Sequence, residues 1–370
     1  MKPFIPEKLP FDSINWEPII PWMGSANREL CRYDGLLGVM PNPDILLTPL
    51  TTQEAVLSSR IEGTQATLGE VFKYEAGEAP LEESKRLDIQ EIINYRRAMK
   101  MAEDELKTRP LSLNLLKKLH ATLLEGVRGR DKGRGEFRTV QNWIGRFGSP
   151  IEEADFIPPD PMVIMEYLDN WEKYCHMDRP DLLVQLAIIH AQFEIIHPFV
   201  DGNGRLGRMI IPLFLFENKI LSRPTFYISA YFEEYRDEYI ERLRALGNQP
   251  DAWNQWILFF LRALTKQALA NTQKARQIFD LYEDLKKRVI ESTHSQYGIT
   301  LLDEMFKRPV FPSNVLDDIP GMPTKPAIIS MLNKLKQAGI LKVIRPSSGR
   351  RAQVLALTEL VNMSEGREVI

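Results

Sequence analysis

Cysteine is scarce in this chain, which has only Cys31 and Cys175 among its 370 residues. Two thiols exclude a disulfide framework and a structural zinc site built from four thiolates. Long hydrophobic runs are also missing, because the longest, 209–216 and 256–261, fall far short of the roughly 20 residues of a membrane-spanning helix. The first sixteen residues carry proline and charge where a signal peptide needs an apolar run. We therefore expect a reduced, soluble, cytoplasmic protein with no membrane partner.

Charge of one sign is not in excess either. The chain has 47 lysines and arginines against 50 aspartates and glutamates, which gives a formal net charge of −3. No global basic field therefore points to nucleic acid. At about 100–200 residues per domain, the length predicts two or three domains.

Helical periodicity dominates the chain and predicts a mainly α fold. We expect an N-terminal arm with helices at 1–109, a core at 110–265, a connecting helix at 266–295 and a C-terminal module at 296–370. Residues 1 to about 50 lack periodicity and are interpreted as an irregular arm. The capping-box spacing of Thr51 to Glu54 predicts a helix over about 51–63. Within and after the core, further helices are expected at 161–176, 181–196, 203–218, 234–246 and 251–291.

The C-terminal module has the order helix, short helix, helix and hairpin, which is typical of a winged helix. The expected helices lie at 299–306, 313–318 and 324–338, and the expected strands at 341–345 and 353–357. Residues 296–358 hold nine lysines and arginines against four acids. Two interpretations stay open: a surface that faces DNA phosphates, and a solvated face on a winged helix that binds protein.

The chemistry is concentrated in residues 197–208, HPFVDGNGRLGR. Glycine and asparagine at 202–204 tolerate positive φ and can turn successive N–H groups toward an anion. A helix follows at once, so the positive end of its dipole faces the same anion. Arg205 and Arg208, three positions apart on that helix, can both hold one polyphosphate.

Two groups at the start of this segment suit phosphate chemistry. Asp201 supplies a hard oxygen ligand of the kind that Mg²⁺ prefers. His197, held by Pro198 just before the glycines, is placed to act as a general base. The alternative is a glycine turn between two helices with solvated arginines, which leaves this combination of residues unexplained.

Two short patterns in the sequence match motifs of other protein families. GxGxxG over 202–207 matches the dinucleotide fingerprint, but a segment of helical length precedes it, and the next acid, Glu217, comes too early. ExxH at 194–197 and 291–294 imitates the paired motifs of di-iron bundles, yet Pro198 forces the preceding histidine out of the α region. We set both interpretations aside.

HPFVDGNGRLGR resembles, position for position, the Fic-domain signature HPFx(D/E)GNGRxxR. The resemblance extends to 135–138 and 157–159, which look like the Fic hairpin flap, and to 231–243, which looks like the helix that closes the nucleotide site. It implies a Fic-like helical core over 110–265 with a small β-hairpin flap, followed by the C-terminal winged helix. Proteins of this family mostly transfer AMP from ATP to a Ser, Thr or Tyr hydroxyl of a protein.

By this resemblance, His197 deprotonates the target hydroxyl and Asp201 holds the Mg²⁺ that bridges the phosphates. ATP is the implied substrate, and a target protein would dock along the flap at about 138–160 by β-addition. Related members transfer other nucleotides or phosphocholine, and no residue here selects ATP. The implied nucleotide-binding residues are Gly202, Asn203, Gly204, Arg205, Arg208 and Tyr239.

A second match, SSRIEG, lies before the core and resembles the inhibitory-helix motif (S/T)xxxE(G/N) of Fic proteins. Its inhibitory residues would be Ser58, Glu62 and Gly63. Glu62 would pair with Arg208, so that ATP binds in an unreactive pose, while Ser58 seats the helix. An interface between copies that displaces this helix would make a homo-oligomer the switch.

Three alternatives to inhibition of a transferase stay open. Glu62 is a solvated residue of an amphipathic helix in the first. In the second, it aligns water to remove AMP from a modified protein. In the third, the chain is a DNA-binding regulator whose core only senses the nucleotide.

Overall fold

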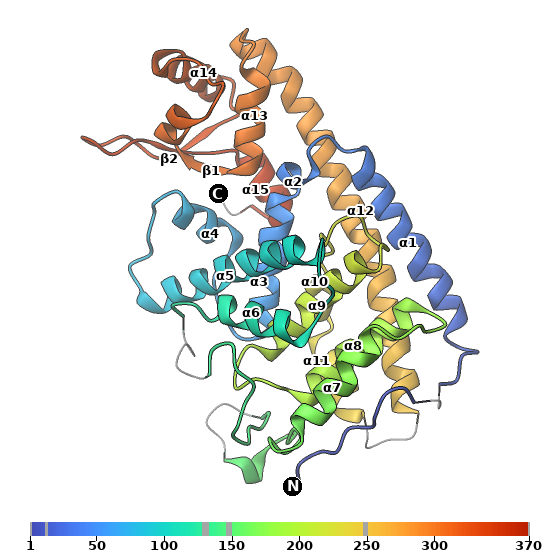
Figure 1. Ribbon diagram of the computed structural model, residues 1–370. Helices are drawn as coiled ribbons and strands as arrows, with labels where there is room; N and C mark the ends of the chain where they lie inside the picture. The colour runs from blue at the N-terminus through green and yellow to red at the C-terminus, as the bar shows by residue number, and fades with distance from the viewer. Residues whose placement is uncertain (1, 12–13, 128–132, 146–149, 247–250, 369–370) are drawn as a thin grey trace. The chain divides into compact units, whose positions relative to one another are not determined.

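The computed structural model describes residues 2–11, 14–127, 133–145, 150–246 and 251–368, and it is mainly helical, as expected (Figure 1). No helix among these residues is long and apolar enough to cross a membrane. The α-helices are α1 (Ile20–Val39), α2 (Pro43–Leu46), α3 (Thr48–Ile61), α4 (Leu68–Glu75), α5 (Glu83–Leu106), α6 (Leu113–Leu123), α7 (Ile164–Cys175), α8 (Leu182–Ile196), α9 (Asn203–Glu217), α10 (Ser229–Glu234), α11 (Arg236–Ala245), α12 (Ala252–Thr293), α13 (Gly298–Lys307), α14 (Lys325–Gln337) and α15 (Thr358–Glu365). The 3-10 helices are η1 (Ile151–Glu153) and η2 (Ser313–Asp318), and the strands are β1 (Val310–Pro312), β2 (Lys342–Arg345) and β3 (Val354–Ala356).

The chain forms two compact units, each built from separate stretches of sequence. The first unit comprises 1–34, 57–63 and 93–270. The second comprises 35–56, 64–92 and 271–370. Each compact unit thus combines N-terminal segments with segments from later in the chain. The four parts expected from the sequence are instead consecutive stretches of the chain, and that division stays a prediction.

The first unit is centred on α8, which packs against both α7 and α9 (Figure 1). Thirteen of the fifteen residues of α8 are buried, and most of them are apolar, as expected for a helix in the interior of a protein. Asp181 begins it by accepting hydrogen bonds from the N–H groups of Leu183 and Val184. Helices α6 and α9 also contact each other, and α11 contacts α8.

The irregular N-terminal arm is shorter than expected. Helix α1 already begins at Ile20, so the prediction of an arm to about residue 50 is wrong. The helix contains Pro21 and three glycines, and its apolar residues show only weak helical periodicity. For these reasons the sequence did not predict it. Within the arm, the N–H of Leu9 donates to Oδ1 of Asn170 at 2.8 Å, and Nδ2 of Asn170 donates back to the Leu9 carbonyl at 2.7 Å.

Two helix boundaries also differ from expectation. Helix α3 begins at Thr48, and Thr51 lies inside it, where its hydroxyl donates to the carbonyl of Leu47 at 3.1 Å. The expected capping box at Thr51 is therefore wrong. The segment 231–243 is not one helix, because Tyr235 interrupts the helical structure between α10 and α11.

The expected flap contains one antiparallel bridge in its described part. The N–H of Ile144 donates to the carbonyl of Phe156 at 2.8 Å, and the N–H of Phe156 donates to the carbonyl of Ile144 at 3.1 Å. Among residues 138–145, the strand pairing of the expected hairpin is thus limited to this bridge. Residues 146–149 of the expected flap lie outside the described part.

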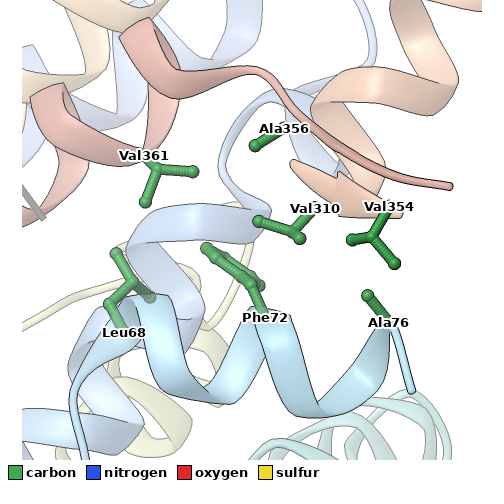
Figure 2. Packing of buried hydrophobic residues seen from close by; sticks show 7 residues of the cluster. All are labelled: Leu68, Phe72, Ala76, Val310, Val354, Ala356 and Val361. Carbon is green, nitrogen blue, oxygen red and sulfur yellow. The ribbon is translucent and has the colours of Figure 1, made fainter. Parts of the chain in front are cut away.

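The second unit contains a three-stranded antiparallel sheet in the order β1-β3-β2. Strand β1, which the sequence analysis did not predict, pairs Val310 with Ala356. Helix α4 contacts β1 and α15, and its apolar face, which includes Phe72, closes one side of a buried cluster (Figure 2). The cluster consists of Leu68, Phe72, Ala76, Val310, Val354, Ala356 and Val361.

Candidate active site

The predicted site is a tight loop between α8 and α9. His197 ends α8 in the left-handed region with φ 48°, and Gly202 precedes α9 with φ 79°. Asn203 closes the loop, because its Oδ1 accepts from the N–H of Phe199 at 2.9 Å and its Nδ2 donates to the carbonyl of Phe199 at 2.8 Å. The Asn203 side chain therefore shapes the loop, and its backbone lies at the positive end of the α9 dipole.

His197 is held by its own helix. Its Nδ1 lies 3.3 Å from the carbonyl oxygen of Glu194, so this nitrogen carries the proton and Nε2 is the acceptor. Burial lowers the pKa of His197 to about 4. The imidazole is thus neutral at pH 7, as a proton acceptor must be.

Arg138 is a site residue that the sequence analysis placed only in the flap. It is buried, and its Nε donates to the carbonyl of His197 at 2.9 Å. Other guanidinium nitrogens donate to the carbonyls of Ile196, Val140 and Pro159. Burial lowers its pKa to about 10, so it remains a cation at the carboxyl end of α8, where the dipole favours positive charge. Arg138 ties the end of α8 to both sides of the expected flap.

His120 is a second residue whose role the sequence did not reveal. Its Nδ1 accepts from the N–H of Gly135 at 2.9 Å, and its Nε2 then donates to the carbonyl of Asp201 at 3.0 Å. Its ring stacks on Phe199 at 4.0 Å between centroids. His120 therefore fixes the backbone of Asp201, whose side-chain Oδ1 lies 3.4 Å from a guanidinium nitrogen of the buried Arg205.

Arg208, Ser58 and Glu62 meet as the second motif predicts. Nη2 of Arg208 donates to Oε1 of Glu62 at 2.6 Å and to the carbonyl of Ser58 at 2.8 Å, while Nε donates to the Ser58 hydroxyl at 2.9 Å. Burial alone would raise the pKa of Glu62, but the charge and hydrogen bond of Arg208 hold it below its ordinary value. Gly63 has φ 102°, which favours glycine and lets the chain turn after Glu62.

Two glycines of α9 leave room for carboxyl groups. A Cβ on Gly204 would lie 2.2 Å from Oε1 of Glu62, and a Cβ on Gly207 would lie 2.0 Å from Oε1 of Glu194. A side chain at either position therefore requires the carboxyl group of that glutamate to move. Glu194 appeared in the sequence analysis only as part of the rejected di-iron motif. In the structure, its carboxyl group lies against the same face of α9 as that of Glu62.

Tyr239 lies behind this face rather than in an open pocket. It is buried, and its hydroxyl lies 2.9 Å from Nε2 of His190. Nδ1 of His190 lies 2.9 Å from the carbonyl of Gly207. Because a carbonyl can only accept, Nδ1–H of His190 donates to Gly207, and Nε2 accepts a hydrogen bond from the Tyr239 hydroxyl. His190 is a buried core histidine, and the expected contact of Tyr239 with the nucleotide stays a prediction.

Comparison with known proteins identifies the fold and family. Residues 20–104 match the model of the Fic/DOC family N-terminal region, and residues 110–215 match the model of the Fic/DOC family. The chain belongs to the Fic/DOC family. Among Fic structures, a Fic family protein from Desulfovibrio desulfuricans G20 aligns over 94% of this chain and 98% of its own, with a TM-score of 0.60 and 21% identity. A Fic-1 fragment from Caenorhabditis elegans aligns over 71% and 73%, with a TM-score of 0.51 and 18% identity.

Curated relatives of this Fic protein are named protein adenylyltransferases. A probable protein adenylyltransferase from Aquifex aeolicus is 27% identical over 180 residues, which is 47% of this chain and 50% of the relative. Protein adenylyltransferase Fic from Drosophila virilis is 26% identical over 192 residues, 52% of this chain and 36% of the relative. The matched region thus spans half or less of these relatives.

Proposed function

We propose that this chain is a protein adenylyltransferase, which transfers AMP from ATP to a Ser, Thr or Tyr hydroxyl of a protein. The observation that carries the proposal is that a neutral histidine, a helix N-terminus and two buried arginines meet in the single segment 197–208. In the transfer, the target oxygen forms a bond to the α-phosphorus, the α–β bridging P–O bond breaks, and pyrophosphate leaves. Such a reaction needs a positioned nucleophile and charge neutralisation more than covalent catalysis.

The residues divide the work by their chemistry. Nε2 of His197 accepts the proton of the target hydroxyl, because Nδ1 is committed to the carbonyl of Glu194. The backbone N–H groups of Asn203 and Gly204 and the α9 dipole hold the phosphates. Arg205 and Arg208 neutralise the remaining phosphate charge. The target segment lies along residues 138–160, where Val140 and Trp143 are exposed apolar side chains.

Asp201 would hold Mg²⁺ together with the phosphates. No group of three or more His, Cys, Asp or Glu side chains in the described part of the chain could hold a metal alone. A magnesium ion bound by one carboxylate, substrate phosphates and water needs no such group. Bound there, the ion would neutralise phosphate charge, and the His120 hydrogen bond would keep the Asp201 backbone in place.

We further propose that Glu62 restrains this activity. Its carboxylate takes a hydrogen bond of the guanidinium that should hold the terminal phosphate. The pair lies within the first compact unit, in the segments 57–63 and 93–270. ATP can then bind only in a pose that is unsuited to in-line attack.

Labelled ATP tests the transfer itself. Glu62→Gly protein and a Glu62→Gly/His197→Ala control are incubated in lysate with ATP labelled at the α- or the γ-phosphate. We expect α-label on protein only with His197 present. Label from the γ-phosphate alone would mean phosphoryl transfer. Equal α-label in the control would show that His197 is not the base that accepts the proton of the target hydroxyl.

A second candidate function, DNA binding, belongs to the C-terminal module, which we infer to be a winged helix. A groove of about 550 Å³ lies among η2, α14 and the β2–β3 hairpin. Four cationic side chains line the groove: Lys325, Lys336, Arg350 and Arg351. Asp317 also lines it and forms an ion pair with Lys325. The exposed face of α14 carries Ser330, Asn333 and Gln337. Amide and hydroxyl groups on a helix flanked by cations suit base edges flanked by phosphates.

Salt dependence tests this second function. We expect binding of a 30-base-pair duplex to weaken steeply with salt, and the Arg350→Glu/Arg351→Glu protein to lose both affinity and slope. An Arg276→Glu/Lys287→Glu protein, which has the same charge change on α12 outside the groove, is the matched control. Equal losses in both variants would leave only a nonspecific charge effect and reject the groove.

A further inference from the structure

Two carboxyl groups lie along one face of α9, one over each glycine. Glu62 lies over Gly204 and Glu194 lies over Gly207, at 2.2 and 2.0 Å from the positions where a Cβ would stand. Residues three apart share a helix face, so both carboxyls reach the strip of helix that carries Arg208. Glu62 is hydrogen-bonded to Arg208. The role of Glu194 is not explained by the motif.

Glu194 differs from Glu62 in its bonding. Its Oε1 is buried and has no hydrogen-bond partner in the described part of the chain. A buried carboxylate oxygen without a partner is costly, and a bound proton removes the charge. Burial, with the charge of Glu62 adding to it and that of Arg208 opposing it, raises the pKa of Glu194 to about 8. Glu194 is therefore a neutral acid at pH 7 while Glu62 is in place.

We propose that Glu194 is a positioning residue for Arg208 and weakens MgATP binding when it loses its proton. The inference rests on the proposed function, because it takes a triphosphate to be the ligand of Arg208. The protonated acid leaves the guanidinium charge to the phosphate. The carboxylate neutralises part of that charge and repels the phosphate. Glu194 thus makes nucleotide binding depend on pH once Glu62 has been displaced.

The titratable groups around Glu194 have pKa values that differ from its own. On its own helix, burial lowers the pKa of His190 to about 3, and His197, at about 4, is already neutral. On α11, burial raises the pKa of Tyr239 well above 10. Arg208 lies on α9, where burial alone would lower its pKa, but interactions with Glu62, Tyr239 and Glu194 outweigh burial and raise it. Between pH 6.5 and 9, Glu194 is therefore the group of this set that titrates.

Removal of Glu62 brings the ionisation of Glu194 closer to neutral pH. The negative charge of Glu62 is one of the causes that raise the pKa of Glu194, so this pKa falls when Glu62 is replaced by glycine. A bound triphosphate supplies negative charge again and raises it. Binding of MgATP must then take up a proton, and its affinity must fall as pH rises.

Calorimetry of MgATP binding at pH 6.5 to 9 tests the proposal. The proteins are Glu62→Gly, Glu62→Gly/Glu194→Gln and a control, Glu62→Gly/Glu217→Gln. Glu217 is a matched carboxyl, because burial raises its pKa too, but it accepts from the N–H of Leu111 at the far end of α9. For each unit by which the phosphate raises the pKa of Glu194, Kd should increase about tenfold across the range.

We expect that increase in Glu62→Gly and in the Glu217 control, and a nearly constant Kd in the Glu194→Gln protein. The same pH dependence in the Glu62→Gly/Glu194→Gln protein as in Glu62→Gly would overturn the proposal. If the Glu194→Gln variant does not fold, repeating the titration of Glu62→Gly in buffers of different ionisation enthalpy decides, since uptake of close to one proton supports the proposal and zero uptake overturns it. Binding that is independent of pH refutes only the role of Glu194, whereas no binding by any variant refutes the proposed function as well.

Discussion

Arg208 donates a hydrogen bond from Nη2 to Oε1 of Glu62 at 2.6 Å, across 146 residues of sequence. The same nitrogen donates to the carbonyl of Ser58, and the neighbouring Nε donates to the hydroxyl of Ser58. Two nitrogens of the guanidinium are thus bonded to one short segment of the chain. A polyphosphate that needs these donors must displace that segment or bind without them.

Ser58 should contribute to the restraint through its hydroxyl. Ser58→Ala removes the acceptor for Nε of Arg208, a hydrogen bond to a charged group worth about 1.5–3 kcal/mol. We expect transfer activity between those of wild type and Glu62→Gly, measured as α-label incorporated. Ser59→Ala is the control, because Ser59 is equally buried and its hydroxyl has no partner in the described structure. Equal activation by both variants would contradict a specific role of Ser58.

Gly207→Ala should be tolerated better when Glu194 is shortened. Gly207→Ala places a Cβ 2.0 Å from Oε1 of Glu194, and overpacking of this kind destabilises proteins by about 1–3 kcal/mol. We expect Gly207→Ala/Glu194→Ala to recover much of that loss in urea unfolding. A double-mutant cycle measures the coupling. Additive losses would show that the two residues do not meet.

Acid should destabilise the fold through two buried histidines. Burial lowers the pKa of His120 to about 4 and that of His190 to about 3. Below pH 6.5 the unfolded chain binds these protons and the folded chain does not, so stability falls as pH falls. Between pH 6 and 5 each histidine contributes on the order of 1 kcal/mol to this loss. Urea unfolding of wild type and His120→Gln isolates the share of one ring, because every other titrating group is common to both proteins. Between pH 6 and 5, His120→Gln should lose about 1 kcal/mol less stability than wild type, and an equal loss in both proteins would contradict the burial of this ring.

Transfer should continue in mildly acidic solution. The pKa of His197 is lowered to about 4 by burial, and loss of the Glu62 charge lowers it further. The acid limb of kcat/KM, which reports the free enzyme, should therefore lie below pH 5 in Glu62→Gly protein. We expect a flat profile from pH 6.5 down to about 5.5, below the range in which Glu194 titrates. A half-loss near pH 6.5, the ordinary value for histidine, would contradict the lowered pKa of His197.

The parts of the site that are contiguous in sequence could be predicted from it. The loop 197–208 carries its turn residues, its cations and its helix start within twelve positions, and the helices around it were expected within a few residues of where they lie. The pair of Glu62 and Arg208 was expected only because a second short motif resembled a known one. Nothing in local pattern links two residues so far apart.

The residues that hold the site in place could not be predicted. His120 and Arg138 act through backbone carbonyls 81 and 59 residues away, and a bond to a backbone atom leaves no trace in the partner's side chain. The position of His120 on the apolar face of its helix was the available signal, and it is equally typical of a core histidine. Strand β1 was missed because three residues are too few to show alternation.

Intact mass of the purified protein tests the central claim most directly. Wild type and Glu62→Gly are each incubated with Mg²⁺ and ATP, and the spectra are compared before and after. The account predicts the added mass of one AMP only or mainly in the variant, because Arg208 is then free to hold the phosphate. Equal modification of both proteins would contradict the restraint, and no modification of either, with MgATP bound by both, would favour a nucleotide sensor or an enzyme that removes AMP.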